Sequence, residues 1–194
     1  QIIGHPRLPD QVAARGPVFL DNLTRIAGDA AMVGTALPQV TAIPENPFRV
    51  DLGGRELELR AAPPAHTDAD LTVRDLGTGT LFTGDLVFRG LTPVVDGSLN
   101  GWLDWMGDPP AEPALIVPGH GRVATTWPEA VMAQHGFLTA LRDAVRDQIA
   151  AGAPMSAAVP AVVAAMAPLA GDWVAFDDTV ARDATAAYQE LEWE

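Results

Sequence analysis

Apolar and polar residues alternate through the middle of the chain, and this alternation predicts a block of short strands. Four segments have the pattern and are spaced as antiparallel neighbours: residues 48–52, 56–61, 71–73 and 81–83. Gly53 and Gly54 stand between the first two segments and predict a tight hairpin turn. A further apolar run at residues 115–117 predicts another buried strand.

Helical periodicity predicts helices on both sides of this block. Before it, a short strand at residues 1–5 leads to two helical stretches, one starting at Asp10 and one over 18–27, and then to a proline-containing connection over 36–47. After it, we expect a short helix around 102–106 and longer helices over 129–151, 154–167 and 178–193. The chain has no internal repeat and no flexible linker. It is therefore predicted to be one α/β domain over residues 1–194, with an antiparallel or mixed sheet and helices covering one face.

The composition narrows the possible partners. Hydrophobic residues make up 48% of the 194 residues and charged residues 19%, which is typical of a chain with a folded core. The net charge is −13 and no Lys/Arg cluster is present, so a nucleic-acid partner is not expected. No apolar run approaches the ~20 residues of a membrane span, and there is no secretory signal. We expect a small-molecule substrate, no nucleic acid and no membrane span; the sequence leaves the oligomeric state open.

Three potential metal ligands stand next to predicted strands. His66 precedes the strand at 71–73, Asp85 follows the strand at 81–83, and His120 follows the strand at 115–117. Each residue alone is more often a turn or surface residue, but a hairpin would bring His66 and Asp85 together, and His-x18-Asp-x34-His is a metal-site pattern. Imidazole nitrogens and carboxylate oxygens suit zinc, iron or manganese. A carboxylate can bridge two cations, so Asp85 is predicted to join a dinuclear centre.

Other polar and aromatic residues near these motifs are weaker candidates. Two could orient His66 as hydrogen-bond acceptors, although a solvated loop is an equally good interpretation: Asp68 and Asp70. Three could line a substrate pocket: Asp96, Ser98 and Trp102. The remaining histidines, His5 and His135, are expected to lie outside the site. There is no Cys, and hence no thiolate ligand or nucleophile.

The segments Ala65-His66-Thr67, residues 81–88 and Val117-Pro118-Gly119-His120-Gly121 resemble the third, fourth and fifth metal motifs of the metallo-β-lactamase superfamily. Residues 4–9, 14–17, 96–103 and 187–194 are similar to the zinc metallohydrolases encoded beside quinoprotein (PQQ) dehydrogenase systems. The resemblance implies an αββα sandwich with two zinc ions, or with iron or manganese in their place. It implies that His66 and His120 are terminal ligands and that Asp85 is the bridging, catalytic carboxylate.

The activity implied by the resemblance is hydrolysis, in which a metal-bound hydroxide attacks an ester, thioester, lactone or amide carbonyl. Gly84-Asp85 resembles the glyoxalase II-like branch more than a Cys-bearing lactamase. The resemblance also implies a bacterial protein, periplasmic or cytoplasmic.

One departure from the family is plain. The His-x-His-x-Asp-His motif is absent, and in the family it precedes a segment like residues 1–9. We therefore expect residues 1–194 to form the C-terminal two-thirds of the sandwich. The alternative is a non-catalytic accessory or binding protein with an incomplete metal site. A flavodiiron-like iron domain has the same ligand types, whereas a phosphodiesterase or nuclease is disfavoured by the acidity.

Overall fold

Two sheets of unequal size organise the chain. The computed structural model describes all residues 1–194 and pairs β1 (Ile2–Gly4) with β2 (Val40–Ala42) in parallel. The larger sheet has the order β3-β4-β5-β6-β7, with β3–β6 antiparallel and β6–β7 parallel. Its strands are Phe48–Asp51, Glu56–Ala61, Leu71–Asp75, Thr80–Phe88 and Leu115–His120. The sheet is thus mixed, one of the two arrangements that the alternating pattern predicts.

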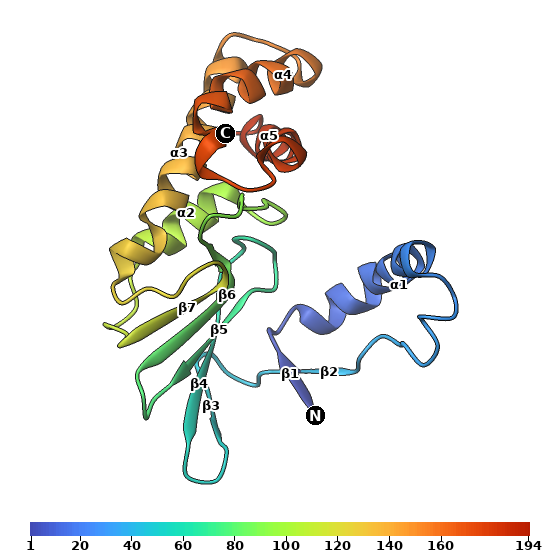
Figure 1. Cartoon of the computed structure of the whole chain (residues 1–194), viewed down its shortest axis with the longest axis vertical. Coiled ribbons are helices and arrows are strands. Elements are labelled where there is room, and N and C mark those ends of the chain that lie inside the picture. Colours follow the sequence, from blue (N-terminus) through green and yellow to red (C-terminus); the bar gives the residue numbers. More distant parts are fainter.

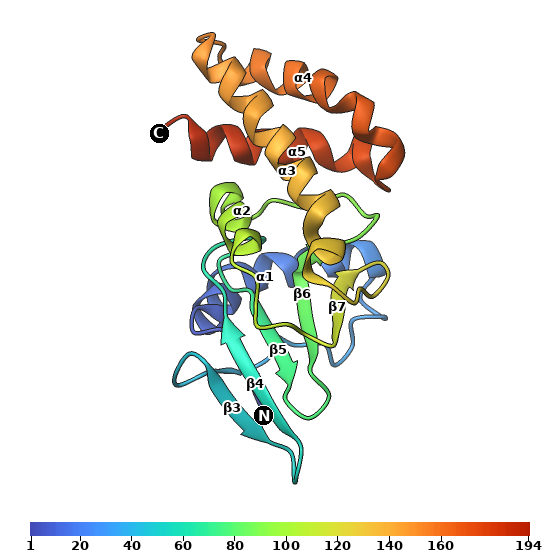
Figure 2. The same ribbon diagram turned by 90° about the vertical axis from the view of Figure 1, so that its left-hand side faces the viewer.

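The helices lie on both sides of these sheets. Helix α1 (Leu8–Ala27) accompanies β1 and β2 on one side of the large sheet, and the other helices gather on its opposite side and beyond the end of β6 (Figures 1 and 2). They are α2 (Leu99–Gly107), α3 (Trp127–Ala150), α4 (Met155–Met166), the 3-10 helix η1 (Ala167–Asp172) and α5 (Phe176–Leu191). This order of helix, small sheet, large sheet and helices is the αββα architecture.

The main core fills the space between the end of β6 and the helices. Leu86, Val87 and Phe88 are buried there, and α3 contributes apolar residues every three or four positions, as an amphipathic helix does. A buried polar side chain completes this region: Gln134 of α3 accepts a hydrogen bond from Phe88 N at 2.7 Å and donates one to Leu86 O at 3.2 Å. Gln134 thereby gives the buried Phe88 N an acceptor and adds a second hydrogen bond to Leu86 O, which also accepts one from Trp102 Nε1.

The N-terminal helix differs from its prediction. Instead of two stretches, α1 is one continuous helix with Pro17 inside it. A proline inside a helix removes one hydrogen bond and crowds the carbonyl four residues earlier, but the remaining hydrogen bonds of α1 keep the helix continuous. The helix begins at Leu8, with Arg7 at the N-cap position and Pro9 in the first turn, where a missing N–H costs little. Asp10 is therefore a first-turn residue, and the predicted start of the helix at Asp10 is wrong.

The strand ends also differ from their prediction. The sequence places Asp85 in a loop after a strand that ends at Thr83, but β6 continues through Asp85 to Phe88. The pairing with β7 shifts on both sides of Gly84, whose φ of +54° breaks the regular pleat. Similarly, β7 extends to His120 itself. The irregular backbone of β6 thus carries Asp85 within the strand.

The segment Met155–Asp172 is long and apolar enough, judged by length and composition only, to cross a membrane. It comprises α4 and η1, with Pro160 inside the helix. Its residues Ala158, Val162 and Met166 are buried, and α4 packs against α3 and α5. In this structure the segment is therefore one layer of a helical cluster, and the absence of a membrane span stays a prediction.

A carboxylate on α5 holds the start of α2. Glu190 accepts hydrogen bonds from Ser98 Oγ at 2.7 Å, Leu99 N at 2.6 Å and Asn100 N at 3.2 Å. The first amides of a helix have no partner within it, and the positive end of its dipole favours an anion.

We predict that Glu190→Ala lowers the free energy of unfolding by about 1–3 kcal/mol, measured by urea denaturation. Glu192→Ala, an exposed neighbour, should change it by less than about 0.5 kcal/mol; equal effects of both variants would refute this role of Glu190.

Candidate metal centre

His66, Asp85 and His120 lie together at one end of the large sheet. His66 Nε2 is 3.9 Å from Asp85 Oδ2, and His120 Nε2 is 3.4 Å from Asp85 Oδ1. The carboxylate therefore lies between two imidazoles, with one oxygen toward each ring. The side chains of Asp85 and His120 are 45% and 42% exposed, whereas that of His66 is 14% exposed. The centre is thus open to solvent on its Asp85–His120 side.

A backbone carbonyl fixes the orientation of the His66 ring. His66 Nδ1 lies 2.6 Å from Val94 O. A carbonyl oxygen can only accept, so Nδ1 carries the proton and the lone pair of a neutral ring resides on Nε2, the atom that faces Asp85. This is the tautomer that a metal ligand needs. The ring also packs against Trp102 and Phe88, with centroid distances of 5.4 and 5.5 Å.

The His120 ring is supported from β6. Phe88 stacks on it with a centroid distance of 4.8 Å and an interplanar angle of 25°. The His120 carbonyl also accepts a hydrogen bond from Arg89 N at 2.9 Å. Phe88 contacts both imidazoles, so the end of β6 sets the positions of the two histidines as well as that of Asp85.

Glycines allow the segments of the centre to approach closely. A Cβ on Gly119 would meet Asp85 Oδ1 and the backbone of Gly84, and a Cβ on Gly97 would lie 2.6 Å from Ala65 O. A Cβ on Gly101 would meet Pro64 O. These contacts are with backbone or with the central carboxylate, none of which can easily move away. Each glycine therefore occupies a place where no side chain fits.

The segment that carries Val94 is fixed in turn by α5. Val95 N donates to Asp183 Oδ1 at 2.9 Å, while Asp183 Oδ2 has no hydrogen-bond partner. Asp183 is fully buried, and this burial raises its carboxyl pKa to about 7, against the lowering effects of the Val95 hydrogen bond and of Arg182. Asp183 thus acts on His66 indirectly, through the Val94–Val95 backbone.

The weaker predicted site residues have varied surroundings. Asp70 does not contact the His66 ring: its carboxylate accepts hydrogen bonds from Thr67 N and Thr67 Oγ1, both at 2.7 Å, and burial raises its pKa against these bonds. Asp68 lies on the wall of a groove described below. The hydrogen-bond acceptor that orients the His66 ring is therefore the Val94 carbonyl and neither of the two predicted carboxylates.

The three predicted pocket residues also separate. Trp102 is fully buried, donates from Nε1 to Leu86 O at 2.8 Å and packs behind His66, so it cannot line an open pocket. Ser98 caps α2: its hydroxyl accepts a hydrogen bond from Gly101 N and donates one to Glu190. The Ser98 hydroxyl is therefore already hydrogen-bonded within the fold. Asp96 alone lies on a groove, where it pairs with Arg15 at 2.8 Å.

The two remaining histidines lie away from the centre. His5 is buried; its Nδ1 accepts from Arg7 N at 3.0 Å and its Nε2 is 3.1 Å from Ala62 O. His135 is exposed on α3. His5 thus has a structural role and His135 lies at the surface, and both are outside the centre, as the sequence predicts.

The donor set determines how well the residues fit a metal. No group of three or more His, Cys, Asp or Glu side chains in residues 1–194 is arranged to hold one metal ion. Asp85 instead offers one oxygen toward each of two imidazoles, the arrangement of a carboxylate shared by two cations. The types of donor suit zinc, while their number is below the three protein ligands that each zinc ion usually takes. His66, Asp85 and His120 therefore offer donors of a suitable type but too few of them to hold a metal ion by themselves.

Family comparison agrees with this geometry. The model of the metallo-beta-lactamase superfamily matches residues 7–122, more than half of the chain, and this match includes all three residues of the centre. The chain therefore belongs to the metallo-β-lactamase superfamily. A search of curated protein sequences finds no match.

Solved structures show the same fold at low sequence identity. The sec-alkylsulfatase Pisa1 from Pseudomonas sp. is 15% identical, with a TM-score of 0.55, over 81% of this chain and 27% of that one. A beta-lactamase domain protein from Burkholderia ambifaria is 18% identical, with a TM-score of 0.59, over 84% and 49%. A metallo-beta-lactamase family protein from Thermus thermophilus is 16% identical, with a TM-score of 0.59, over 98% and 65%. The chain thus spans less than two thirds of each of these proteins.

The buried carboxyl of Asp183 predicts a dependence of stability on pH. Its pKa is about 7 in the folded protein and about 3.9 in an unfolded chain, so between these values the folded state holds the extra proton and loses stability as the pH rises. We expect the free energy of unfolding, measured in urea, to be about 2–4 kcal/mol lower at pH 8 than at pH 5 because of this residue. Asp183→Asn removes this difference, whereas Asp178→Asn, exposed on the same helix, keeps it. A wild-type pH profile in Asp183→Asn would disprove the assignment.

The close approach at Gly119 predicts a localised cost for a single methyl group. Gly119→Ala forces the new Cβ into Asp85 and Gly84, and such overpacking should lower the free energy of unfolding by about 1–3 kcal/mol. Gly136→Ala is the matched control, because nothing lies within 4 Å of its Cβ position. It lies within α3 and should raise stability by about 0.5–1 kcal/mol. Chemical denaturation of both variants decides the matter, and a neutral Gly119→Ala would contradict the close contact.

Proposed function

We propose that the protein is a zinc-dependent hydrolase of an ester, thioester, lactone or amide bond, with iron or manganese as other metals that suit the same donors. The observation that carries the proposal is the Asp85 carboxylate placed between His66 Nε2 and His120 Nε2. Membership of the superfamily and the αββα architecture support it. A small-molecule substrate is part of the proposal, and the net charge of −13 disfavours a polyanionic one.

In this proposal each residue has a distinct role. His66 and His120 are terminal ligands and Asp85 is the shared ligand. Bound zinc supplies an acidified water and a positive charge that stabilises an oxyanion. The Val94 carbonyl keeps the proton of His66 on Nδ1, so that Nε2 stays available. The half-exposed Asp85 and His120 leave a path by which water and a small substrate can enter.

The number of ligands sets a condition on the proposal. Two imidazoles and one shared carboxylate are fewer donors than two zinc ions need. The His-x-His-x-Asp-His motif of the superfamily is the source of donors that the resemblance implies. The proposed hydrolase therefore needs the side chains of that motif as metal ligands in addition to His66, Asp85 and His120.

The link to a quinoprotein (PQQ) oxidation system rests on the resemblance of particular segments. Two of them, residues 96–103 and 187–194, are in contact, since Ser98 donates to Glu190 and Asn100 to Glu194 at 2.6 Å. Their joint structural role supports treating them as one feature of this branch. A glyoxalase II-like position of Asp85 and a bacterial, periplasmic or cytoplasmic location belong to the same proposal.

A second candidate function is that of a non-catalytic accessory or binding protein. It is favoured by the absence of any three-donor group within residues 1–194. Such a protein keeps the fold and a groove for its ligand without turning the ligand over. Metal content and turnover, measured together, separate the two functions.

The test uses the protein expressed from its complete gene. Asp85→Asn should remove at least one zinc per chain, by elemental analysis, and lower kcat/KM for 4-nitrophenyl acetate or an S-acetyl thioester by at least about 100-fold. Asp104→Asn, an exposed residue of α2, is the control and should change neither value. If the wild-type protein retains zinc but hydrolyses no member of an ester, thioester, lactone and amide panel, the binding function replaces the hydrolase. If Asp85→Asn is as active as the wild type, the role of Asp85 is wrong.

A further inference from the structure

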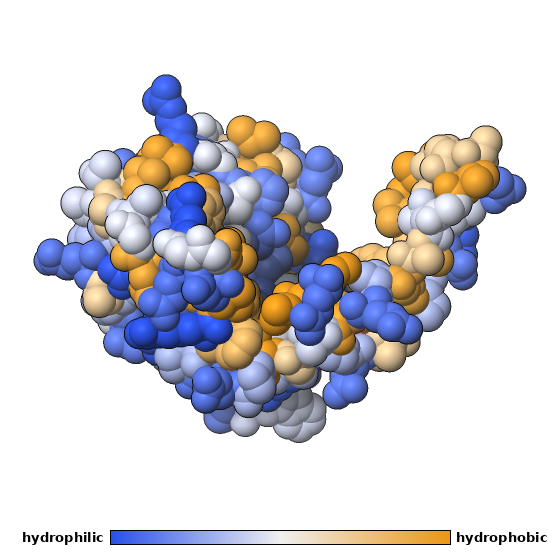
Figure 3. All heavy atoms as spheres, turned by 90° about the horizontal axis from the view of Figure 1, so that it is seen from below, coloured by the Kyte–Doolittle hydropathy of each residue, from blue (hydrophilic) through white to orange (hydrophobic).

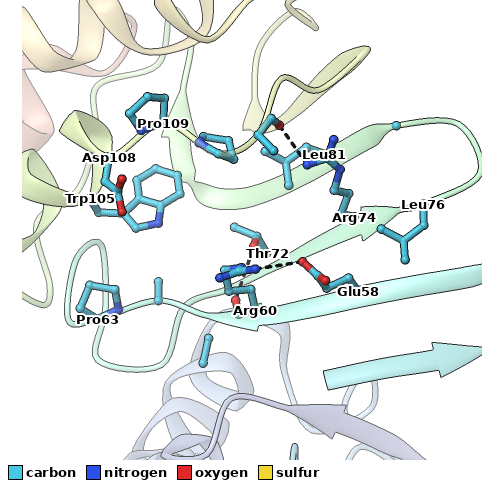
Figure 4. Close-up of a pocket in the computed structure, with 15 residues that line it drawn as sticks. Glu58, Arg60, Pro63, Thr72, Arg74, Leu76, Leu81, Trp105, Asp108 and Pro109 are labelled. Atoms are coloured by element: carbon cyan, nitrogen blue, oxygen red, sulfur yellow. Dashed lines mark hydrogen bonds and ion pairs between the residues drawn. The ribbon is translucent and has the colours of Figure 1, made fainter. Parts of the chain in front are cut away.

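Two cavities of about 620 and 340 Å³ lie at the surface of the molecule. The larger, about 620 Å³, is a crevice between the sheet and residues 108–111 (Figure 4). Its cationic side chains are engaged in the fold: Arg74 donates to Ala111 O and Glu112 O, and Arg60 pairs with Glu58 at 3.1 Å. The Arg74 contacts fix the loop over the crevice, and both arginines are thereby occupied within the fold.

The second cavity is a groove of about 340 Å³ between α1 and the loops that carry the metal centre. One wall is made by α1 and by Leu37 and Pro38, and the other by residues 67–69 and Asp96. This second wall belongs to the centre itself, because Thr67 follows His66 and Asp96 N donates to His66 O at 2.9 Å. A molecule bound in the groove therefore lies beside the backbone that carries a proposed metal ligand.

The α1 wall of the groove is apolar because of its helical spacing. Leu8, Val12 and Phe19 recur at intervals of four and seven residues, which places them on one face of the helix. The stripe continues to Leu23 and Ile26, which are 52% and 84% exposed. Apolar side chains are also visible on the arm that projects from the body of the molecule (Figure 3). Phe19 remains 56% exposed although it lines the groove. Covering such a side chain with an apolar group is favourable, since burial removes apolar surface from water.

The one cation that lines the groove is paired, and Asp68 adds a further carboxylate to the wall opposite α1. Arg15 Nη2 pairs with Asp96 Oδ2 at 2.8 Å across it, and Arg182 lies 3.9 Å from Asp96 Oδ1. The Arg15 charge is therefore already matched, which leaves the apolar α1 wall as the principal recognition surface. An uncharged hydrocarbon group fits this surface better than a carboxylate or phosphate does.

We propose that this groove is the subsite for an apolar acyl or aryl group of the substrate. This inference rests on the proposed hydrolase and narrows its substrate class to esters or thioesters whose acyl group is a chain or ring on the order of six to eight carbons, a size that suits a cavity near the lower limit for small-ligand pockets. Phe19 and Val12 contact the hydrocarbon, and the reacting carbonyl lies at the wall formed by residues 67–69, next to His66 in the chain.

The kinetic test is a matched pair of substitutions on α1. Val12→Trp fills the groove, whereas Val18→Trp adds the same side chain at a position that is 62% exposed and outside the groove. In the holoenzyme, Val12→Trp should lower kcat/KM for 4-nitrophenyl hexanoate at least about tenfold, while 4-nitrophenyl acetate changes by less than about threefold. Val18→Trp should match the wild type with both esters. An unchanged preference for hexanoate over acetate in a folded Val12→Trp protein overturns the subsite.

A binding measurement separates the failure of the subsite from the failure of the hydrolase. Saturation-transfer NMR with hexanamide needs no turnover; the wild type and Val18→Trp should give a signal that Val12→Trp lacks. If hexanamide binds in this way but no ester is hydrolysed, the subsite stands and the proposed function fails. If esters are hydrolysed and hexanamide binds all three proteins equally, the reverse holds. Should Val12→Trp not fold, Phe19→Ala replaces it and is expected to weaken hexanamide binding; unchanged binding overturns the subsite.

Discussion

The hydrogen bond between His66 Nδ1 and the Val94 carbonyl is the interaction on which the proposed centre depends. It selects the tautomer whose free lone pair faces Asp85, and it fixes the plane of a ring that has packing contacts on its other sides. The carbonyl is itself held, because Asp183 binds the next amide. Glu190 binds the start of α2 a few residues later. Local geometry at the centre is therefore set by a helix that contributes no ligand.

Sequence patterns predict the parts of this fold that local rules determine. Alternation of period two identifies four of the five strands of the large sheet and their antiparallel order. The hairpin between β5 and β6 is sufficient to predict that His66 and Asp85 meet, which the structure shows at 3.9 Å. The αββα architecture follows from the resemblance of the motifs. The extension of β6 past Gly84 was not predictable, because a bulge depends on the parallel partner strand and not on the residues of β6 alone.

The supporting residues of the centre have little local signal. Val94 acts through its carbonyl, which every residue possesses, and Gly119 is needed because Asp85 approaches it from another strand. Asp183 sits on the inner face of α5 among alanines, where an acidic residue in an apolar stripe is the one available hint. The groove could not be predicted either, because an apolar stripe on a helix usually faces the core, whereas the structure leaves Phe19 exposed to solvent. Packing between residues that are far apart in the sequence determines all of these features, and residue spacing along the chain does not predict such packing.

The position of α5 in the chain has a consequence for the order in which the three side chains of the centre reach their final places. Synthesis proceeds from the N-terminus, and β5, β6 and β7 leave the ribosome well before α5 does. The hairpin can then bring His66 to Asp85, but the segment around Val94 lacks Asp183 and Glu190, which fix it only after α5 has docked. An unfixed imidazole rotates and exchanges its tautomers. The final arrangement of His66 beside Asp85 is therefore reached at the end of folding, after the helix that fixes it has docked.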